Sequence, residues 1–374
     1  MGKIDFGAMS KRKRALYECM WGSEDFDFPV EKTIFKRTLP DHSRTEVPSN
    51  NSYTFAGASA VNKDLCADRL ADLFNIQHRE LFREKFDQSC GGDGQERKRI
   101  AVLHSSALCA LLFFYNVSKE NPYGMEIEGE TYIFTDSRFE YQNTVIEGRN
   151  PSNVDVVLIG TDSAGKPAVL FLESKFSEYY EGTGKRLEVA AAYLDDRCGN
   201  VLYGKSALEK LELDMITREG DETFTLCSKE SCYLEGIKQM ISHYIGLRNL
   251  CEKPDGREDA VAREISAGAR VLLGEILFTK GIGQLPVRNG GECLASYRKK
   301  YMALAAVLNE QLEKDGISGR FTVLRDILSY SQFQDKAYIQ EPLVRRFYFE
   351  LGRDTPCQRR PAPSAISAPS AVSR

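Results

Sequence analysis

The spacing of apolar side chains changes several times along the chain, and each spacing predicts a different kind of element. Residues 63–86 carry apolar side chains at helical spacing. Residues 100–117 (IAVLHSSALCALLFFYNV) are apolar on nearly every side, which predicts a buried helix. Residues 1–60 contain several prolines, show neither pattern, and are predicted to be irregular. Helical spacing returns in four later segments: 187–196, 204–215, 233–250 and 294–314.

Between these helices, short apolar runs predict strands. The runs 153–160 (NVDVVLIG) and 168–176 (AVLFLESKF) are separated by the turn-rich segment TDSAGKP, which predicts an antiparallel hairpin. Their continuous hydrophobicity places both strands centrally in a sheet that is covered on both faces. Residues 132–145 mix aromatic and β-branched side chains as a strand does, whereas 269–279 (ARVLLGEILFT) fits a buried strand or a helix. The pattern therefore predicts a mixed α/β (α+β) fold.

Ionisable residues interrupt the two apolar runs. Glu173 and Lys175 end the second run, and strand periodicity places both side chains on one face of the sheet. Asp155 lies within the first run. In the predicted hairpin residue i pairs with roughly residue 328 − i, which puts Asp155 opposite Glu173 or its immediate neighbours. Ionisable groups gathered at one sheet edge are costly unless they bind something, so these residues form the candidate site.

The triplet Glu-x-Lys carries little information by itself, because about one is expected by chance in a chain of this length. A second copy, Glu96–Lys98, lies in the glycine-rich and charged segment 88–99, which is predicted to be a solvated loop. Glu173 and Lys175 differ because they end a buried strand and face an acidic residue. A buried Lys–carboxylate cluster with a purely structural role is the alternative interpretation.

The candidate site suits a divalent cation. Two carboxylates a few ångströms apart repel each other, and a divalent cation relieves that repulsion. Hard oxygen ligands favour Mg²⁺ or Mn²⁺, and the backbone carbonyl of Ser174 is a further candidate ligand. Such a metal lowers the pKa of a bound water and neutralises charge that develops on a phosphate, while Lys175 orients or helps deprotonate that water, or stabilises the phosphorane.

A helix, then Asp in one strand, then Glu-x-Lys in the next resembles the PD-(D/E)xK nuclease superfamily. The segments NPSNVDVVLIG, LFLESKFSEYY and LHSSALCALLFFYN are similar to bacterial putative restriction endonucleases within it. The resemblance implies a restriction-endonuclease-like αβββαβ core over residues 100–280, with a mixed sheet flanked by helices. It implies catalytic roles for Asp155, Glu173 and Lys175, the first two also as metal ligands. Val154 replaces the proline that usually precedes the Asp.

Further positions fit the superfamily pattern less closely. The first core helix has no acidic residue, so Glu140 beside the first strand is the candidate substitute ligand, with a surface charge as the alternative. RecB-like members carry Gln-x3-Tyr on the helix after Glu-x-Lys. Here that helix has Gln239, with His243 four residues on and Tyr244 after it. Gln239 and His243 share a helix face and are candidates to position a phosphate or a metal-bound water, or they are simply an exposed pair.

Composition limits the class of protein. The chain has 374 residues, a net charge of -4 and a pI near 5.8, so a DNA-binding surface must be local. No apolar run approaches the roughly 20 residues that span a bilayer. Scattered cysteines fit a reducing cytoplasmic environment and no membrane association is expected. The expected domains are an N-terminal extension with a helix at 1–99, the nuclease core at 100–280, a C-terminal helical addition at 281–352 and a disordered tail at 353–374.

The resemblance implies a Mg²⁺-dependent nuclease that cleaves DNA in restriction, defence or repair. One alternative is a catalytically inactive nuclease fold that binds nucleic acid or another partner. A structural protein is the other alternative, but it leaves the buried charges without a role. The sequence has no P-loop motif, so ATP-driven movement along DNA would require an accessory helicase. A methyltransferase partner and a homodimer stay open.

Overall fold

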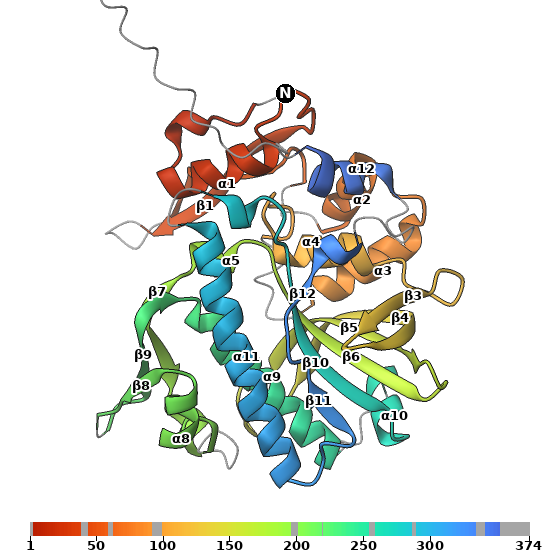
Figure 1. Ribbon diagram of the computed structural model, residues 1–374. Helices are drawn as coiled ribbons and strands as arrows, with labels where there is room; N and C mark the ends of the chain where they lie inside the picture. Colours follow the sequence, from red (N-terminus) through yellow and green to blue (C-terminus); the bar gives the residue numbers. More distant parts are fainter. Residues whose placement is uncertain are drawn as a thin grey trace, which may run out of the picture.

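A mixed sheet forms the centre of the molecule (Figure 1). The computed structural model describes residues 3–38, 44–58, 63–91, 99–195, 201–218, 220–253, 259–285, 289–333 and 341–351. The strands of the central sheet are β3 (Tyr123–Ile127), β4 (Glu130–Asn143), β5 (Ser152–Asp162), β6 (Pro167–Lys175), β10 (Arg270–Leu277), β11 (Phe321–Val323) and β12 (Leu328–Ser329). Their order is β11-β10-β6-β5-β4-β3, and β12 also pairs with β10. The mixed α/β class predicted from the sequence is confirmed.

The strand directions explain how the centre of the sheet is built. The pairs β3–β4, β4–β5 and β5–β6 are antiparallel, whereas β10 runs parallel to β6. The pairs between β5 and β6 extend from Val156–Leu172 to Thr161–Pro167, which is the register predicted from the hairpin. The segment 269–279, for which both strand and helix were open, is a strand.

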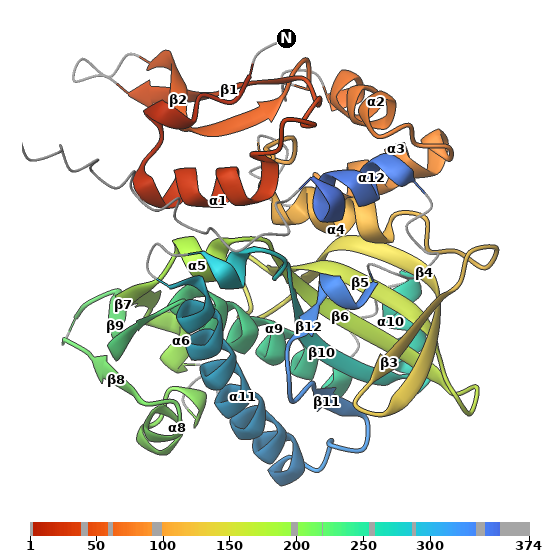
Figure 2. The same ribbon diagram turned by 45° about the horizontal axis from the view of Figure 1, so that its top comes forward.

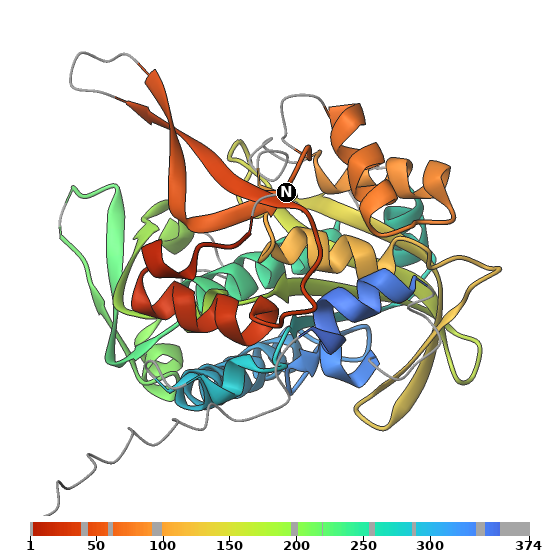
Figure 3. The same cartoon turned by 90° about the horizontal axis from the view of Figure 1, so that it is seen from above.

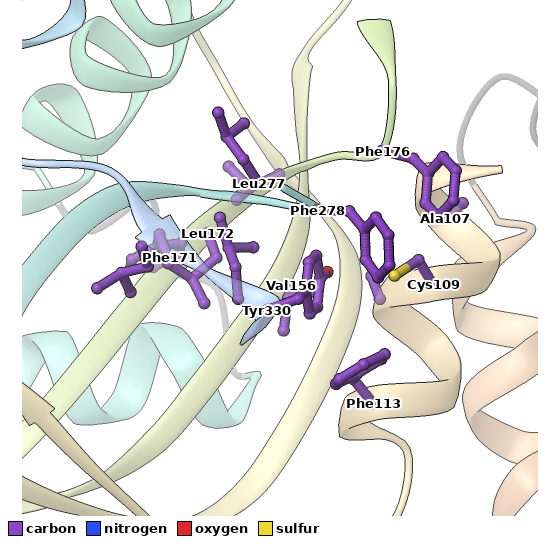
Figure 4. Packing of buried hydrophobic residues seen from close by; sticks show 14 of the residues in the cluster. Ala107, Cys109, Phe113, Val156, Phe171, Leu172, Phe176, Leu277, Phe278 and Tyr330 are labelled. Carbon is purple, nitrogen blue, oxygen red and sulfur yellow. The ribbon is translucent and has the colours of Figure 1, made fainter. Parts of the chain in front are cut away.

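Two helices cover opposite faces of this sheet. Helix α4 (Ser106–Phe114) is buried along its whole length apart from its first residue, as predicted, although it is shorter than the segment 100–117. Figure 4 shows Cys109 and Phe113 of α4 facing Phe278 and Tyr330, and the rings of Phe113 and Tyr330 lie 4.6 Å apart. Helix α9 (Leu234–Glu252) packs on the other face and contacts β4 and β5. The crossover from β6 to β10 also contains α10 (Ala260–Ser266).

The N-terminal region is more regular than predicted. Residues 1–60 contain a short 3-10 helix, α1 and a long antiparallel ribbon. These elements lie above the sheet in Figure 2, and Figure 3 gives the view onto them from above. Their bounds are η1 (Phe6–Ala8), α1 (Lys11–Trp21), β1 (Val30–Thr38) and β2 (Arg44–Phe55). The prediction of irregular structure is therefore wrong. The sequence did not reveal β2 because only its last four residues are buried. The exposed part of the ribbon needs no alternating apolar side chains, so it leaves no strand pattern in the sequence.

Two helix predictions are corrected by the structure. The helix predicted at 63–86 is divided into α2 (Lys63–Leu73) and α3 (Arg79–Ser89), with Asn75 between them at a φ of 52° that a helix cannot continue through. Residues 187–196 and 204–215 are helical only in part, in α6 (Ala192–Asp195) and α8 (Lys205–Lys210). Residues 187–190 and 213–215 instead belong to a separate antiparallel sheet formed by β7 (Gly184–Ala190), β8 (Leu213–Ile216) and β9 (Thr223–Cys232). The central strand β9 supplies backbone partners that local periodicity does not reveal.

The C-terminal region extends the central sheet as well as adding helices. It contains the predicted long helix, here α11 (Gly290–Lys314), but β11 and β12 pair with β10. Its short helical elements are η3 (Ile282–Gln284), η4 (Tyr330–Phe333), α12 (Pro342–Arg345) and the π-helical turn η5 (Arg346–Glu350). Among the described residues, no helix is both long and apolar enough to cross a membrane. The predicted tail 353–374 and the pair Glu96–Lys98 lie outside the described residues.

One hydrophobic core joins these regions. It is continuous from Ile4 to Leu351, across the boundaries predicted near residues 100 and 280. Phe347 in η5 is fully buried among rings of the N-terminal region, with centroid distances of 5.5 Å to Trp21, 5.1 Å to Phe28 and 5.2 Å to Phe55. The last segment of the described chain therefore packs against the first.

Candidate active site

The candidate site lies where β5 and β6 separate. The last regular pair is Val156–Leu172, and the next residues on the two strands are Asp155 and Glu173. The backbone N–H of Ser174 donates a hydrogen bond to Asp155 Oδ2 at 2.7 Å. Because the N–H and C=O of a strand residue point to the same side, the Ser174 carbonyl also faces this gap. Three candidate oxygen ligands from the sequence thus come together at one fork.

The side chains of β6 alternate between the two faces of the sheet as predicted. Ser174 points toward α4, where its Oγ donates to the carbonyl of Ser106 at 3.1 Å. Glu173 and Lys175 point toward α9, and Lys175 Nζ donates to Glu173 Oε1. Both are nearly inaccessible, with exposed fractions of 2% for Glu173 and 5% for Lys175. A buried ion pair therefore stands directly beside Asp155.

The second carboxylate oxygen of Glu173 is held by His243 of α9. Nε2 of His243 lies 2.8 Å from Glu173 Oε2, and its Nδ1 lies 2.7 Å from Ser152 Oγ at the start of β5. The helix therefore contacts Glu173 through His243 rather than through Gln239. Tyr244 is buried in the core, with its ring stacked 5.7 Å from that of Phe321.

A polar cavity of about 370 Å³ adjoins the two carboxylates. Asp155, Glu173, Gln239 and Glu140 line it, and so do Ser152, Asn153 and His243. Lys175 does not line the cavity itself but contacts Glu173, which does.

Glu140 enters this cavity from β4. The flanking pairs Phe139–Val156 and Tyr141–Val154 place Glu140 across from Asp155. Its backbone has a φ of 49°, in the left-handed region that non-glycine residues seldom adopt. Such strain gathers at functional sites, where the surrounding structure holds it in place. The position and the backbone agree with the choice of Glu140 as the substitute acidic residue.

Burial and neighbouring charges shift the pKa values of the three ionisable groups of the site. Burial raises the pKa of Asp155 well above its ordinary value, and the negative charge of Glu173 raises it further. For Glu173, burial alone would raise the pKa, but Lys175 and the contact with His243 lower it. Burial likewise disfavours the charged form of Lys175, yet the charge of Glu173 raises its pKa well above the ordinary value. Of these two carboxyl groups, Asp155 is therefore the one whose negative charge is less compensated by Lys175.

Two amide oxygens in the cavity wall also lack partners. The side-chain oxygens of Asn153 and Gln239 are buried and accept no hydrogen bond from the described residues. Buried acceptors of this kind are costly unless a ligand or water donates to them. Mg²⁺ usually keeps several water ligands, whose hydrogens are donors. Among the described residues no three His, Cys, Asp or Glu side chains are already grouped to hold a metal ion. The unpartnered oxygens of Asn153 and Gln239 thus fit the water ligands of a hydrated cation.

A further buried acid beside the site was missed in the sequence. Glu275 of β10 pairs in register with Glu173 of β6 and is completely buried. The hydroxyl of Tyr297 lies 2.7 Å from both of its carboxylate oxygens. Burial raises the pKa of Glu275 to about 8. A charge within the apolar run VLLGEIL is the same signal that identified Asp155, so the sequence did contain it.

The pKa of Glu275 predicts that stability falls as the pH rises. Between its ordinary value of 4.5 and about 8, the folded chain holds a proton that the unfolded chain has released. This group alone then lowers the unfolding free energy by about 1.4 kcal/mol per pH unit over that range. Glu275→Gln should remove this pH dependence. The free energy of unfolding of the variant relative to that of the wild type should therefore be higher at pH 8 than at pH 5. Urea unfolding in EDTA measures this, with the exposed Glu126→Gln as control. An equal stability difference at both pH values would contradict it.

The structure brings Asp155, Glu173, Glu140 and Gln239 to one cavity and places Lys175 against Glu173. Comparison with protein-family models, curated proteins and solved structures finds no match. The function is therefore inferred from the geometry and chemistry of this site.

Proposed function

We propose that this chain is a Mg²⁺-dependent nuclease that hydrolyses phosphodiester bonds of DNA, in restriction, defence or repair. The observation that carries the proposal is the fork between β5 and β6, where Asp155 and Glu173 stand opposite each other beside a polar cavity. Lys175 lies on the same face. Grouping these charges in the interior costs free energy, which binding a cation and an anionic substrate offsets.

The order of the elements supports a PD-(D/E)xK type of nuclease core. Helix α4, strands β4, β5 and β6, helix α9 and strand β10 occur in this order as an αβββαβ unit, with the small sheet β7–β9 inserted before α9 and α10 inserted before β10. Strand β3 adds a hairpin before β4, and β10 returns parallel to β6. The proposed catalytic residues lie on the two central strands of this unit, between the helices that cover its faces.

The proposed metal ligands are Asp155, Glu173 and the carbonyl of Ser174, with Glu140 as a fourth. A bound Mg²⁺, or Mn²⁺ in its place, supplies the positive charge that activates water and neutralises charge developing on the phosphate. The raised pKa of Asp155 supports this role, because a nearby cation favours the ionised form of a carboxyl group that is otherwise held protonated.

Lys175 is proposed to orient the attacking water. Although burial disfavours its charged form, the negative charge of Glu173 raises the pKa of Lys175, so in the present structure the side chain is a hydrogen-bond donor. In the present structure Glu173 holds its ammonium group. From this position beside Glu173, Lys175 would donate a hydrogen bond to the attacking water or to the phosphate. Gln239, on the same cavity wall, is proposed to position the phosphate.

Metal-dependent cleavage of DNA tests the proposal. Supercoiled plasmid, linear duplex and single-stranded DNA are incubated with Mg²⁺, with Mn²⁺ or with EDTA. Cleavage of at least one substrate is expected with either metal, none in EDTA, and restoration when Mg²⁺ is added in excess. Nicking of the plasmid would indicate an endonuclease. Binding of DNA without metal-dependent cleavage would instead favour the inactive nuclease fold.

A further inference from the structure

The contact between Ser152, His243 and Glu173 is a second feature of the site that the proposed reaction does not by itself require. Ser152 begins β5 and His243 lies in the middle of α9, and both line the cavity. The imidazole is 2% exposed and bridges the two residues, with contacts of 2.7 Å to Ser152 and 2.8 Å to Glu173.

The chemistry of the groups sets the direction of the hydrogen bond between His243 and Glu173. An ionised carboxylate only accepts, so His243 Nε2 must donate to Glu173 Oε2. The other nitrogen, Nδ1, shares a hydrogen bond with Ser152 Oγ, in which the hydroxyl donates to a neutral imidazole or accepts from a protonated one. In either case the contact with Ser152 orients the ring so that Nε2 donates to Glu173.

We infer that Ser152 and His243 are positioning residues that hold the Glu173 carboxylate in place for a divalent cation. The inference rests on the proposed function. Lys175 contacts Glu173 Oε1 and His243 contacts Oε2, so both carboxylate oxygens are fixed in position at the cavity wall. Each carboxylate oxygen has two acceptor positions, and one on each remains for a cation.

This role differs from that of a histidine that only fills the core. A core histidine would affect stability, whereas a residue that orients a metal ligand affects metal affinity. Loss of a hydrogen bond to a ligating carboxylate typically lowers metal affinity or activity by about 10–100-fold. Ser152 provides an independent check, because it touches His243 but has no contact with Glu173 among the interactions described here.

Two amide substitutions separate these roles. The side-chain nitrogen of His243→Gln can take the place of Nε2 and still donate to Glu173. That of His243→Asn lies where Nδ1 was and cannot reach Glu173. Isothermal titration with Mn²⁺ measures metal affinity, and thermal unfolding checks the fold. We expect His243→Asn to weaken Mn²⁺ binding by about 10–100-fold, Ser152→Ala by about tenfold, and His243→Gln by much less.

The outcomes separate this inference from the proposed function. If the wild type neither binds Mn²⁺ nor cleaves DNA, the proposed function fails. If the wild type binds and cleaves, but His243→Asn and Ser152→Ala bind Mn²⁺ as tightly as it does, the positioning role is wrong. If His243→Asn does not fold, the Mn²⁺ affinity of Ser152→Ala tests the positioning role, because this variant leaves the imidazole in the core. Equal losses in His243→Gln and His243→Asn would also overturn the inference.

Discussion

Asp155→Asn is expected to reduce metal-dependent DNA cleavage by at least about 100-fold while the protein stays folded. The asparagine oxygen can still accept the hydrogen bond from the Ser174 backbone, so the fork between β5 and β6 is preserved. What is lost is a negative charge that a divalent cation needs. The initial rate of plasmid or duplex cleavage at saturating Mg²⁺ measures the effect, and thermal unfolding shows whether the fold is intact.

Lys175→Ala applies the same test to β6, and a similar loss of metal-dependent DNA cleavage is expected. A matched control is Glu126→Gln, which removes an acidic group from the exposed side of β3 in the same sheet. The control should cleave at the rate of the wild type. Full metal-dependent activity in both Asp155→Asn and Lys175→Ala would show that the proposed site is wrong.

Phe347→Ala is expected to lower the free energy of unfolding by about 3–5 kcal/mol. Phe347 is completely buried, and its ring contacts Trp21, Phe28, Phe55 and Phe74 at centroid distances of 5.1 to 5.7 Å. Removing it leaves a cavity between the N-terminal region and the end of the described chain, and the surrounding rings lose edge and stacking contacts. Denaturant unfolding followed by tryptophan fluorescence measures the change, because Trp21 stands beside the substituted ring.

The shape of the unfolding curve carries further information. A continuous core predicts one cooperative transition that moves as a whole. Met302→Ala, on the exposed side of α11, is the control and should change stability by less than about 0.5 kcal/mol. Two transitions, of which only one responds to Phe347→Ala, would show that the N-terminal region is a separate unit, as the boundary near residue 100 suggests.

Several features of the site follow from the sequence because they depend on short-range geometry. The connection between β5 and β6 is so short that the hairpin register is set locally, and this register places Asp155 opposite Glu173. The two-residue period of a strand separates Ser174 from its neighbours. The apolar surface of α4 on nearly every side predicts that it is buried. Each of these conclusions needs only a few consecutive residues.

The contacts that complete the site depend on distant parts of the chain. His243 reaches Glu173 across a sequence separation of 70 residues, and Tyr297 reaches Glu275 from α11. The ribbon of β1 and β2 is likewise held by backbone pairing, and most of β2 has no apolar alternation to mark it. Spacing along a chain indicates which face a residue occupies, not which distant residue faces it. The sequence alone therefore determined the central Asp–Glu–Lys constellation, and only the tertiary structure decided what surrounds it, because packing between elements brings those groups together.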